Sequence, residues 1–416
     1  MDRWQSATVK NLSRLFERID LDEAVGDLMD PESMPWFPRV AASSVTEGDS
    51  APAGFISKVL HLRWDSLPML LPDGDPGSAT WWSLQSATWG QWPKLVPIRA
   101  EPTPSGWRIE FESHFAEILP LDDDGHGRKL AELNCRVLHT AIGGVQHEGR
   151  DVILLFEKEN GRDVPLDEEH LRMIGAALGE FHALAATHLA TPNDERAWND
   201  HNAGLERKTR SATVWRGPHS ADTQGTITHR NFGVSVCQLV DGEIRIGGCM
   251  GGVKNALIPE RSPYPAIRDI GACYVTLHDQ DPALRKALFE GWTTTVPKHW
   301  HSSRATDTHR GGTAIWEYEQ MLCHRLYNQA WGMDEPAYVT HWLAGVSRIQ
   351  NGMYQARTLS VAGLICFSII PAAVFYWIFY PGSPSPTISD LGAMGALGIC
   401  GILLRRMYRA AAPNPW

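Results

Sequence analysis

The sequence lacks the features that mark several common classes of protein. Its seven cysteines are odd in number and no two are separated by only two residues, which argues against a disulfide framework or a zinc ribbon. We therefore expect free thiols in a reducing compartment. The Gly-x-Ser-x-Gly signature of a hydrolase nucleophile is absent. The formal net charge is -10 and no long basic stripe occurs, so no nucleic-acid partner is expected.

Two runs near the C-terminus lack charge almost entirely. Leu359 to Tyr380 covers 22 residues without a charged side chain, enough for a helix to cross a membrane. A second run, Leu391 to Leu404, has 14 residues and is short for a span. It suffices if Thr387, Ile388 and the apolar stems of Arg405 and Arg406 are added. The alternative is a single span followed by a re-entrant or interfacial segment.

Glycines recur at every third position of the second run. In lipid, such small residues let a neighbouring helix approach closely. We predict helix packing at these glycines, either against the first span or against another membrane-protein subunit. The glycines concerned are Gly392, Gly395, Gly398 and Gly401.

The charges around these runs predict an orientation. Arg357 precedes the first run, Arg405, Arg406 and Arg409 follow the second, and the loop between them has no Lys or Arg. Because positive residues stay on the cytoplasmic side, we expect the body and both termini in the cytoplasm. The chain would then be a two-span protein of the cell inner membrane.

The rest of the chain divides into segments of different composition. We predict an N-terminal helical arm and linker at 1–54, a strand-rich small lobe at 55–160, a helix-rich large lobe at 161–345 and a transmembrane hairpin at 346–416. The small lobe has a tryptophan group that either packs inside or forms a surface for a partner. Its members are Trp81, Trp82, Trp89 and Trp92.

Periodicity and composition predict the elements within these segments. Strands are expected at Phe55 to Trp64, Lys94 to Ala100, Trp107 to Glu112, Phe115 to Leu121, Asp151 to Glu157, Thr226 to Leu239 and Glu243 to Ile246, with a turn at Asp241-Gly242. Helices are expected at Arg128 to Thr140, at Asp167 to Leu189 and repeatedly from Ala266 to Thr358.

Six short stretches follow one another in a characteristic order: Phe156-Glu157-Lys158, Asn160-Gly161-Arg162-Asp163, Leu178 to Leu184, Thr228-His229-Arg230-Asn231-Phe232, Val240 to Ile244 and Pro265 to Gly271, which contains Asp269. Together they resemble the aminoglycoside phosphotransferase family, the bacterial branch of the protein-kinase-like fold. The resemblance covers Asp151 to about Trp292. It implies an α+β, two-lobed body, to which the uncharged runs add two C-terminal transmembrane helices. It also implies that Asp269 braces the catalytic loop.

The resemblance also implies catalytic groups that this chain does not have. The family uses an Asp in the catalytic loop, an Asn five residues later and an Asp after the hairpin to position the nucleophile and hold magnesium. Here these degenerate positions are Asn231, Val236 and Gly248, and no acid occurs between Glu243 and Glu260.

The phosphate-binding groups of the family are missing as well. No Lys or Arg occurs between Arg108 and Arg128, where the phosphate-binding lysine belongs, and no Gly-x-Gly-x-x-Gly loop precedes these strands. Glu132 matches the glutamate of the small-lobe helix but lacks its lysine partner.

These losses favour a non-catalytic scaffold or regulatory subunit of a membrane complex. Two alternatives stay open: an active membrane-tethered phosphotransferase that uses residues such as Asp269 or Asp241, and an ATP sensor without turnover. No cofactor is expected, although ATP with magnesium is possible. No metal site is expected, because His299 and His301 have no second pair of ligands at metal spacing.

Overall fold

The structure is a computed structural model, and it describes most of the chain from residue 88 onward. The described residues are 88–91, 99–103, 106–118, 125–147, 150–219, 223–248, 263–302, 305–306, 308–330, 334–380, 382 and 384–410. The predicted N-terminal arm, the strand predicted at Phe55 to Trp64 and three of the four tryptophans, Trp81, Trp82 and Trp92, lie outside them.

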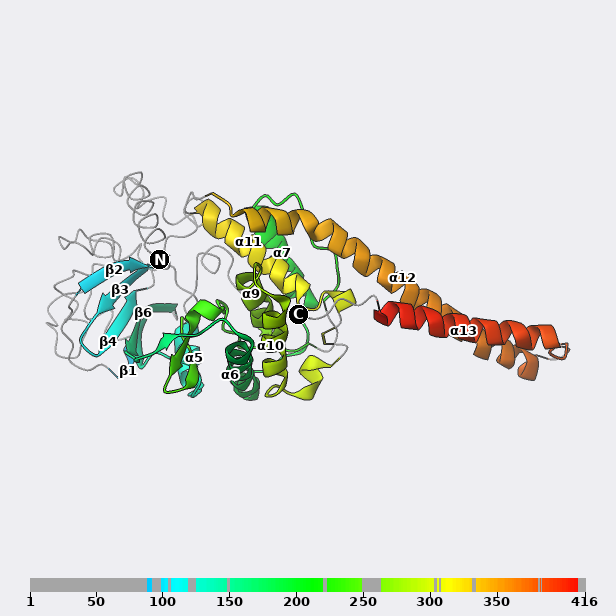
Figure 1. Ribbon diagram of the computed structural model, residues 1–416, viewed down its shortest axis with the longest axis horizontal. Helices are drawn as coiled ribbons and strands as arrows, with labels where there is room; N and C mark the ends of the chain where they lie inside the picture. Colours follow the sequence, from blue (N-terminus) through cyan, green and yellow to red (C-terminus); the bar gives the residue numbers. More distant parts are fainter. Residues whose placement is uncertain are drawn as a thin grey trace.

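The small lobe is a six-stranded antiparallel sheet with the order β1-β5-β6-β4-β3-β2 (Figure 1). Its strands are β1 Thr88–Gly90, β2 Arg99–Thr103, β3 Gly106–Glu110, β4 His114–Ile118, β5 Gly143–His147 and β6 Arg150–Glu157. Strands β2, β3 and β4 form a meander. The chain then passes through a helix to β5 and β6. Strand β6 lies between β4 and β5 and pairs with both of them.

The crossover helix α5 is His126–Glu132 and is shorter than predicted. The helix predicted to reach Thr140 was wrong beyond Glu132, because Asn134 takes a left-handed conformation with φ 49° and ends the helical run. The chain then pairs with a strand of the large lobe instead. Ile246 donates its N–H to the carbonyl of Val137 at 2.8 Å.

The large lobe is a helical assembly around one apolar core. Its main helices are α6 Glu168–His188, α7 Glu195–Lys208, α9 Ile267–Thr276, α10 Pro282–Thr293 and α11 Ala314–Ala330. Helix α6 begins at the predicted place, where the Asp167 side chain accepts the N–H of His170 and satisfies a free donor of the first turn.

Helices α6 and α10 touch backbone to backbone. A Cβ at Gly175 would lie 2.0 Å from the carbonyl oxygen of Leu288, and one at Gly291 would lie 2.0 Å from that of Arg172. Only glycine fits at these two crossing points.

A small hairpin lies beside the short strand that follows the connection between the lobes. It consists of β9 Cys237–Val240 and β10 Glu243–Ile246, with the short strand β7 Arg162–Asp163 beside β9. Its turn has positive φ at both Asp241 and Gly242, as the sequence predicted for a two-residue hairpin. The strand predicted from Thr226 was wrong over most of its length. Only β8 Gly225–Thr226 precedes a loop and a short 3-10 helix, Val234–Val236.

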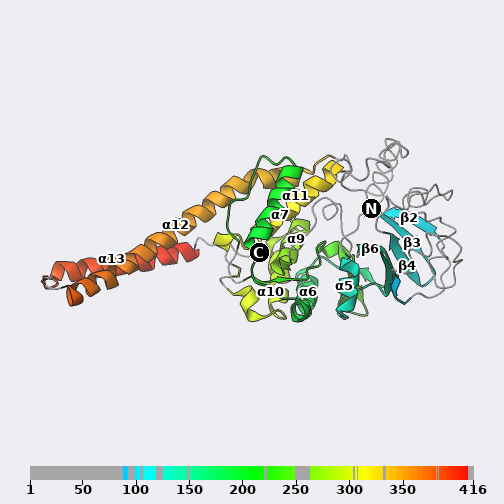
Figure 2. The ribbon, with the colours of Figure 1, turned by 180° about the vertical axis from the view of Figure 1, so that it is seen from behind.

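Two long apolar helices end the described chain, α12 Ala337–Phe379 and α13 Ile388–Ala410, and both are long and apolar enough to cross a membrane. Together with the sheet and helices of the body, they confirm the predicted α+β class. Both views show the pair projecting from the large lobe, away from the small-lobe sheet (Figures 1 and 2). The predicted boundary at residue 346 falls inside α12, which continues unbroken from the body into the apolar segment.

The four glycines of α13 do not share one face, because a spacing of three residues turns each one about 60° from the last. A Cβ at Gly401 would lie 3.0 Å from the Phe367 ring, and one at Gly398 would lie 3.7 Å from Ile370. Nothing lies within 4 Å at Gly392 or Gly395. Two glycines therefore pack inside the hairpin, and packing of the other two against a partner helix stays a prediction.

Candidate functional site

The buried carboxylate of Asp269 fixes the backbone of the loop at Thr228 to Asn231. Asp269, in the first turn of α9, accepts the backbone N–H of His229 on Oδ2 at 2.6 Å and that of Arg230 on Oδ1 at 3.1 Å. Asp269 is fully buried. The predicted brace is confirmed. Arg230 takes a positive φ of 73°, and these bonds offset the cost of that conformation.

A third hydrogen bond completes the environment of Asp269. Trp292 donates its indole N–H to Nδ1 of His182 at 3.0 Å, so His182 must carry its proton on Nε2. That Nε2 lies 2.9 Å from Asp269 Oδ2 and donates to it. Burial by itself raises the pKa of the Asp269 carboxyl, but the hydrogen bonds from His182 and from the backbone N–H of His229 outweigh it and hold this pKa below its usual value.

The two degenerate metal positions lie side by side. A Cβ at Gly248 would lie 2.8 Å from Cγ1 of Val236, and Gly247 donates its N–H to the Val236 carbonyl at 2.8 Å. The fold thus brings together the positions that the resemblance assigns to magnesium, but it presents an isopropyl group and no side chain there. Neither can bind a hard cation, which takes oxygen ligands. Among the described residues, no three His, Cys, Asp or Glu side chains converge on a possible metal position.

Strand β4, where the resemblance would put a phosphate-binding lysine, carries a glutamate. Glu117 on β4 pairs directly with Leu154 on β6, so both side chains emerge on the same face of the sheet. A Cβ at Gly127 of α5 would lie 2.4 Å from Leu154. This face is therefore the one that α5 covers, and it is where a lysine on this strand would meet the glutamate of the helix.

Glu117 is buried and poorly compensated. It is 8% exposed, and its Oε2 has no hydrogen-bond partner among the described residues. Burial raises the pKa of this carboxyl to about 7, against the opposing pull of the Arg108 charge. Glu132, the predicted helix glutamate, does not face a lysine. It accepts a hydrogen bond from Arg128 one turn earlier on α5, at 2.8 Å.

Aromatic rings fill the space beside Glu117. Phe115 and Phe156 stack with ring centroids 5.0 Å apart, and the His139 ring lies within 6 Å of both. The guanidinium of Arg108 lies 3.8 Å from the centre of the Phe115 ring. His139 donates from Nε2 to the carbonyl of Glu157 at 2.7 Å. Its side chain thus occupies the carbonyl of the last residue of β6, just before the connection between the lobes.

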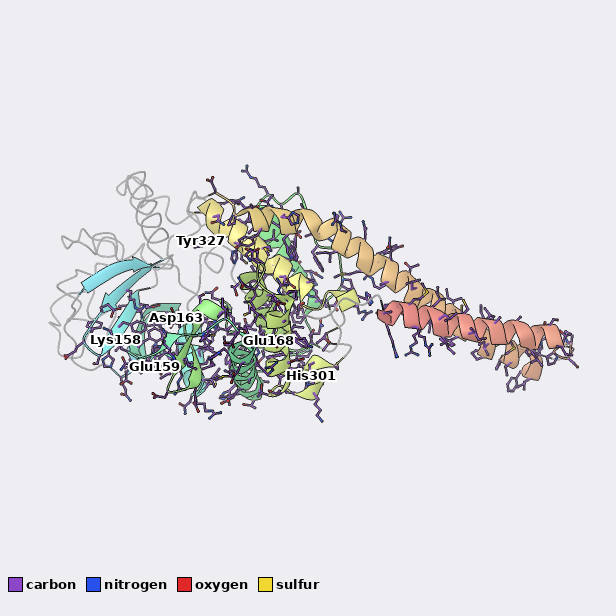
Figure 3. The ribbon with its side chains drawn as sticks, in the orientation of Figure 1. Lys158, Glu159, Asp163, Glu168, His301 and Tyr327 are labelled. Carbon is purple, nitrogen blue, oxygen red and sulfur yellow. The ribbon has the colours of Figure 1, made fainter. Side chains whose placement is uncertain are left out.

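The connection between the lobes forms one ion pair with each lobe. Lys158 forms an ion pair with Glu110 of β3 at 2.7 Å, and Glu159 forms one with Arg245 of β10 at 3.7 Å. Figure 3 labels Lys158, Glu159 and Asp163 along it, between the small-lobe sheet and α6. The lobes are therefore tied together by contacts from both.

The sequence pattern predicted Asn231, Val236 and Gly248 as degenerate positions but did not reveal two other features of the site. It showed that a lysine is missing from the strand, but not that Glu117 lies on the face of this strand that α5 covers. The face on which the Glu117 side chain lies follows from its pairing with Leu154. That pairing depends on the register of β4 against β6, which the sequence alone does not give. The contact of His139 with Glu157 was hidden because a helix was predicted there. Cys249 and its neighbours after Gly248 lie outside the described residues.

Comparisons with known proteins add a similarity of fold. No family model matches the chain, and no curated protein matches it. A glucosamine kinase in complex with glucosamine, ADP and inorganic phosphate aligns at 14% identity with a TM-score of 0.43, over 61% of this chain and 74% of that chain. A Plasmodium vivax ethanolamine kinase aligns at 11% identity with a TM-score of 0.41, over 80% and 95%.

An aminoglycoside phosphotransferase from Alicyclobacillus acidocaldarius aligns at 11% identity with a TM-score of 0.33, over 66% of this chain and 93% of that chain. At such values we take nothing about activity or substrate from these proteins. By its own strand order and its loop braced by Asp269, the chain has a kinase-like phosphotransferase fold.

Proposed function

We propose that this protein is a non-catalytic, membrane-anchored member of the kinase-like fold that serves as a scaffold or regulatory subunit of a membrane protein complex. One observation carries the proposal. The skeleton of the catalytic loop is intact around Asp269, while Glu117, Val236 and Gly248 stand where phosphate and metal would be bound.

Electrostatics disfavours nucleotide phosphates in this cleft. Ionised Glu117 would repel them, because repulsion between like charges is strong in a poorly solvated site. Its pKa of about 7 leaves it partly ionised at neutral pH. Arg108 does not replace the lysine, because its guanidinium lies over the Phe115 ring and beside Glu110, with Nε 3.1 Å from Oε1. Without oxygen ligands at Val236 and Gly248, magnesium would have to be held by the nucleotide alone.

Packing disfavours the base as well. A nucleobase would need a flat apolar slot and hydrogen-bonding groups of the inter-lobe connection. Here the stacked rings of Phe115 and Phe156 occupy the apolar space, and the imidazole of His139 already donates to the Glu157 carbonyl.

The two acids named for an active alternative are poorly suited to catalysis. Asp269 is buried and accepts three hydrogen bonds, so it has no oxygen free to act as a base. Asp241 sits exposed at the tip of the β9–β10 hairpin in a left-handed turn. An ATP sensor that binds without turnover is the remaining alternative, and the same experiment tests it.

The test is ligand binding by the full-length protein in mild detergent. We expect millimolar ATP with magnesium to leave the melting temperature unchanged, whereas a ligand at 100 times its Kd would stabilise the folded state by about 2.7 kcal/mol. A magnesium-dependent rise of several degrees would contradict the proposal. ADP release in the same preparation would then identify an active phosphotransferase, and its absence would identify a sensor.

The scaffold part of the proposal has its own test. Purification in the same detergent should bring down at least one membrane protein in constant ratio. Recovery of the chain alone, as a monomer, would refute the scaffold part even if nucleotide binding is absent.

A further inference from the structure

Basic side chains gather where the hairpin meets the body. The last 80 residues contain five arginines and a single acid, Asp390, in a chain that has 38 basic and 48 acidic side chains overall. Arg405, Arg406 and Arg409 lie in the last two turns of α13, and Arg357 lies midway along α12. Arg310, exposed on the 3-10 helix η5 Thr308–Arg310, joins them from the large lobe.

The hairpin is attached to the body at two places. The first part of α12 is buried in the core through Val339, Leu343 and Val346. The end of α13 returns to the body, as Figure 1 shows, where buried His309 donates from Nε2 to the carbonyl of Tyr408 at 2.9 Å. The two rings lie 4.4 Å apart. The arginines are thus held at a defined position relative to the large lobe.

The packing of the two helices sets the depth of Arg405 and Arg406. A Cβ at Gly363 would lie 3.5 Å from Leu404 and 3.8 Å from the backbone nitrogen of Arg405. The backbone of Arg405 therefore lies level with Gly363, which is several residues inside the apolar run of α12. The uncharged part of α13, Leu391 to Leu404, spans about 21 Å at 1.5 Å per residue, less than the hydrocarbon core of about 30 Å.

In a bilayer, this shortfall would bring the guanidinium groups to the level of the lipid phosphates. Long arginine side chains extend along a helix until the charge reaches the interface. Arg405, Arg406 and Arg409 are exposed, and Arg357 is partly exposed. Neither these four nor Arg310 forms an ion pair with a carboxylate of the described residues. A planar guanidinium binds two phosphate oxygens at once.

We propose that this arginine belt, made of Arg310, Arg357, Arg405, Arg406 and Arg409, binds the phosphate headgroups of anionic phospholipids. The belt holds an acidic body against a membrane surface that would otherwise repel it. This surface is separate from the inter-lobe cleft. The lipid-binding proposal does not depend on the scaffold proposal, which is tested by nucleotide and partner binding.

The test is lipid selectivity of the full-length protein. The protein, purified in a mild non-ionic detergent, is mixed with equal amounts of phosphatidylglycerol and phosphatidylcholine, and the retained lipids are counted by native mass spectrometry. We expect phosphatidylglycerol to be enriched. The triple variant R405Q/R406Q/R409Q should lose affinity for it by about fivefold per arginine, or roughly a hundredfold in all.

A matched variant controls for net charge. R162Q/R172Q/K286Q also removes three positive charges, all from exposed positions on β7, α6 and α10, and should keep the enrichment. Equal retention of the two lipids by the native protein, or an undiminished preference in R405Q/R406Q/R409Q, would overturn the proposal.

Two further variants keep the test decisive if the triple glutamine variant does not fold. R406Q alone should weaken phosphatidylglycerol binding about fivefold. R405K/R406K/R409K keeps the charge and should retain most of the enrichment. An unchanged lipid preference in R406Q combined with a complete loss in the lysine variant would also refute headgroup binding through these charges.

Discussion

Replacing Glu117 by glutamine should make the protein more stable, and the gain should depend on pH. Burial raises the pKa of this carboxyl from its ordinary value of 4.5 to about 7. The folded state therefore holds the Glu117 proton more tightly than the unfolded state does. The contribution of Glu117 is most favourable below pH 4.5, declines as the pH rises through 7 and is a full cost above that.

The size of the effect follows from the shift. A difference of about 2.5 units corresponds to roughly 3 kcal/mol by which ionised Glu117 destabilises the folded state. Glu117→Gln removes the titration but keeps the shape of the protonated acid. We expect little change at pH 4.5 and a gain approaching 3 kcal/mol at pH 8. For a body of about 290 residues, that gain corresponds to a rise of roughly 5 °C in melting temperature.

The assay is thermal unfolding of the full-length protein in mild detergent at several pH values. Glu110→Gln is the matched control, because Glu110 lies on the adjacent strand but forms ion pairs with Arg108 at 3.1 Å and Lys158 at 2.7 Å. Its loss should cost up to about 1 kcal/mol. A Glu117→Gln variant that is less stable than the native protein at pH 8 would refute the reasoning, since it would mean that ionised Glu117 is stabilised by contacts.

Two further predictions concern the brace and the hairpin. Asp269→Asn should destabilise the protein by about 3 to 5 kcal/mol, because an amide nitrogen would face donors from His182 and the loop; a thermal melt within 2 °C of the native value would contradict this. Gly401→Leu should separate α12 from α13, where the Phe367 ring lies 3.0 Å from a Cβ, whereas Gly392→Leu meets nothing within 4 Å. Oxidative cross-linking of the facing thiols Cys366 and Cys400 measures the separation of the two helices. We expect a reduced cross-linking yield only for Gly401→Leu. Equal yields in the two variants would count against this packing.

Local pattern was sufficient where one short stretch decides its own conformation. Asp167 with the apolar spacing after it predicted α6, and Asp241-Gly242 predicted a turn in which both residues take positive φ. Pattern failed at Arg128 to Thr140, where apolar spacing predicted one helix. There the chain leaves α5 to pair with Ile246, more than a hundred residues away, and no local signal encodes that contact.

The sequence by itself determined which groups the cleft lacks and where the chain is apolar enough to enter a membrane, because both follow from residue type alone. The family resemblance of Pro265 to Gly271 also implied that Asp269 is the brace. The tertiary structure decided what replaces the missing groups. Strand register puts Glu117 on the face covered by α5, and chain crossing puts His139 against the Glu157 carbonyl. These outcomes depend on pairings between distant segments, which fix the side of each side chain and its neighbours.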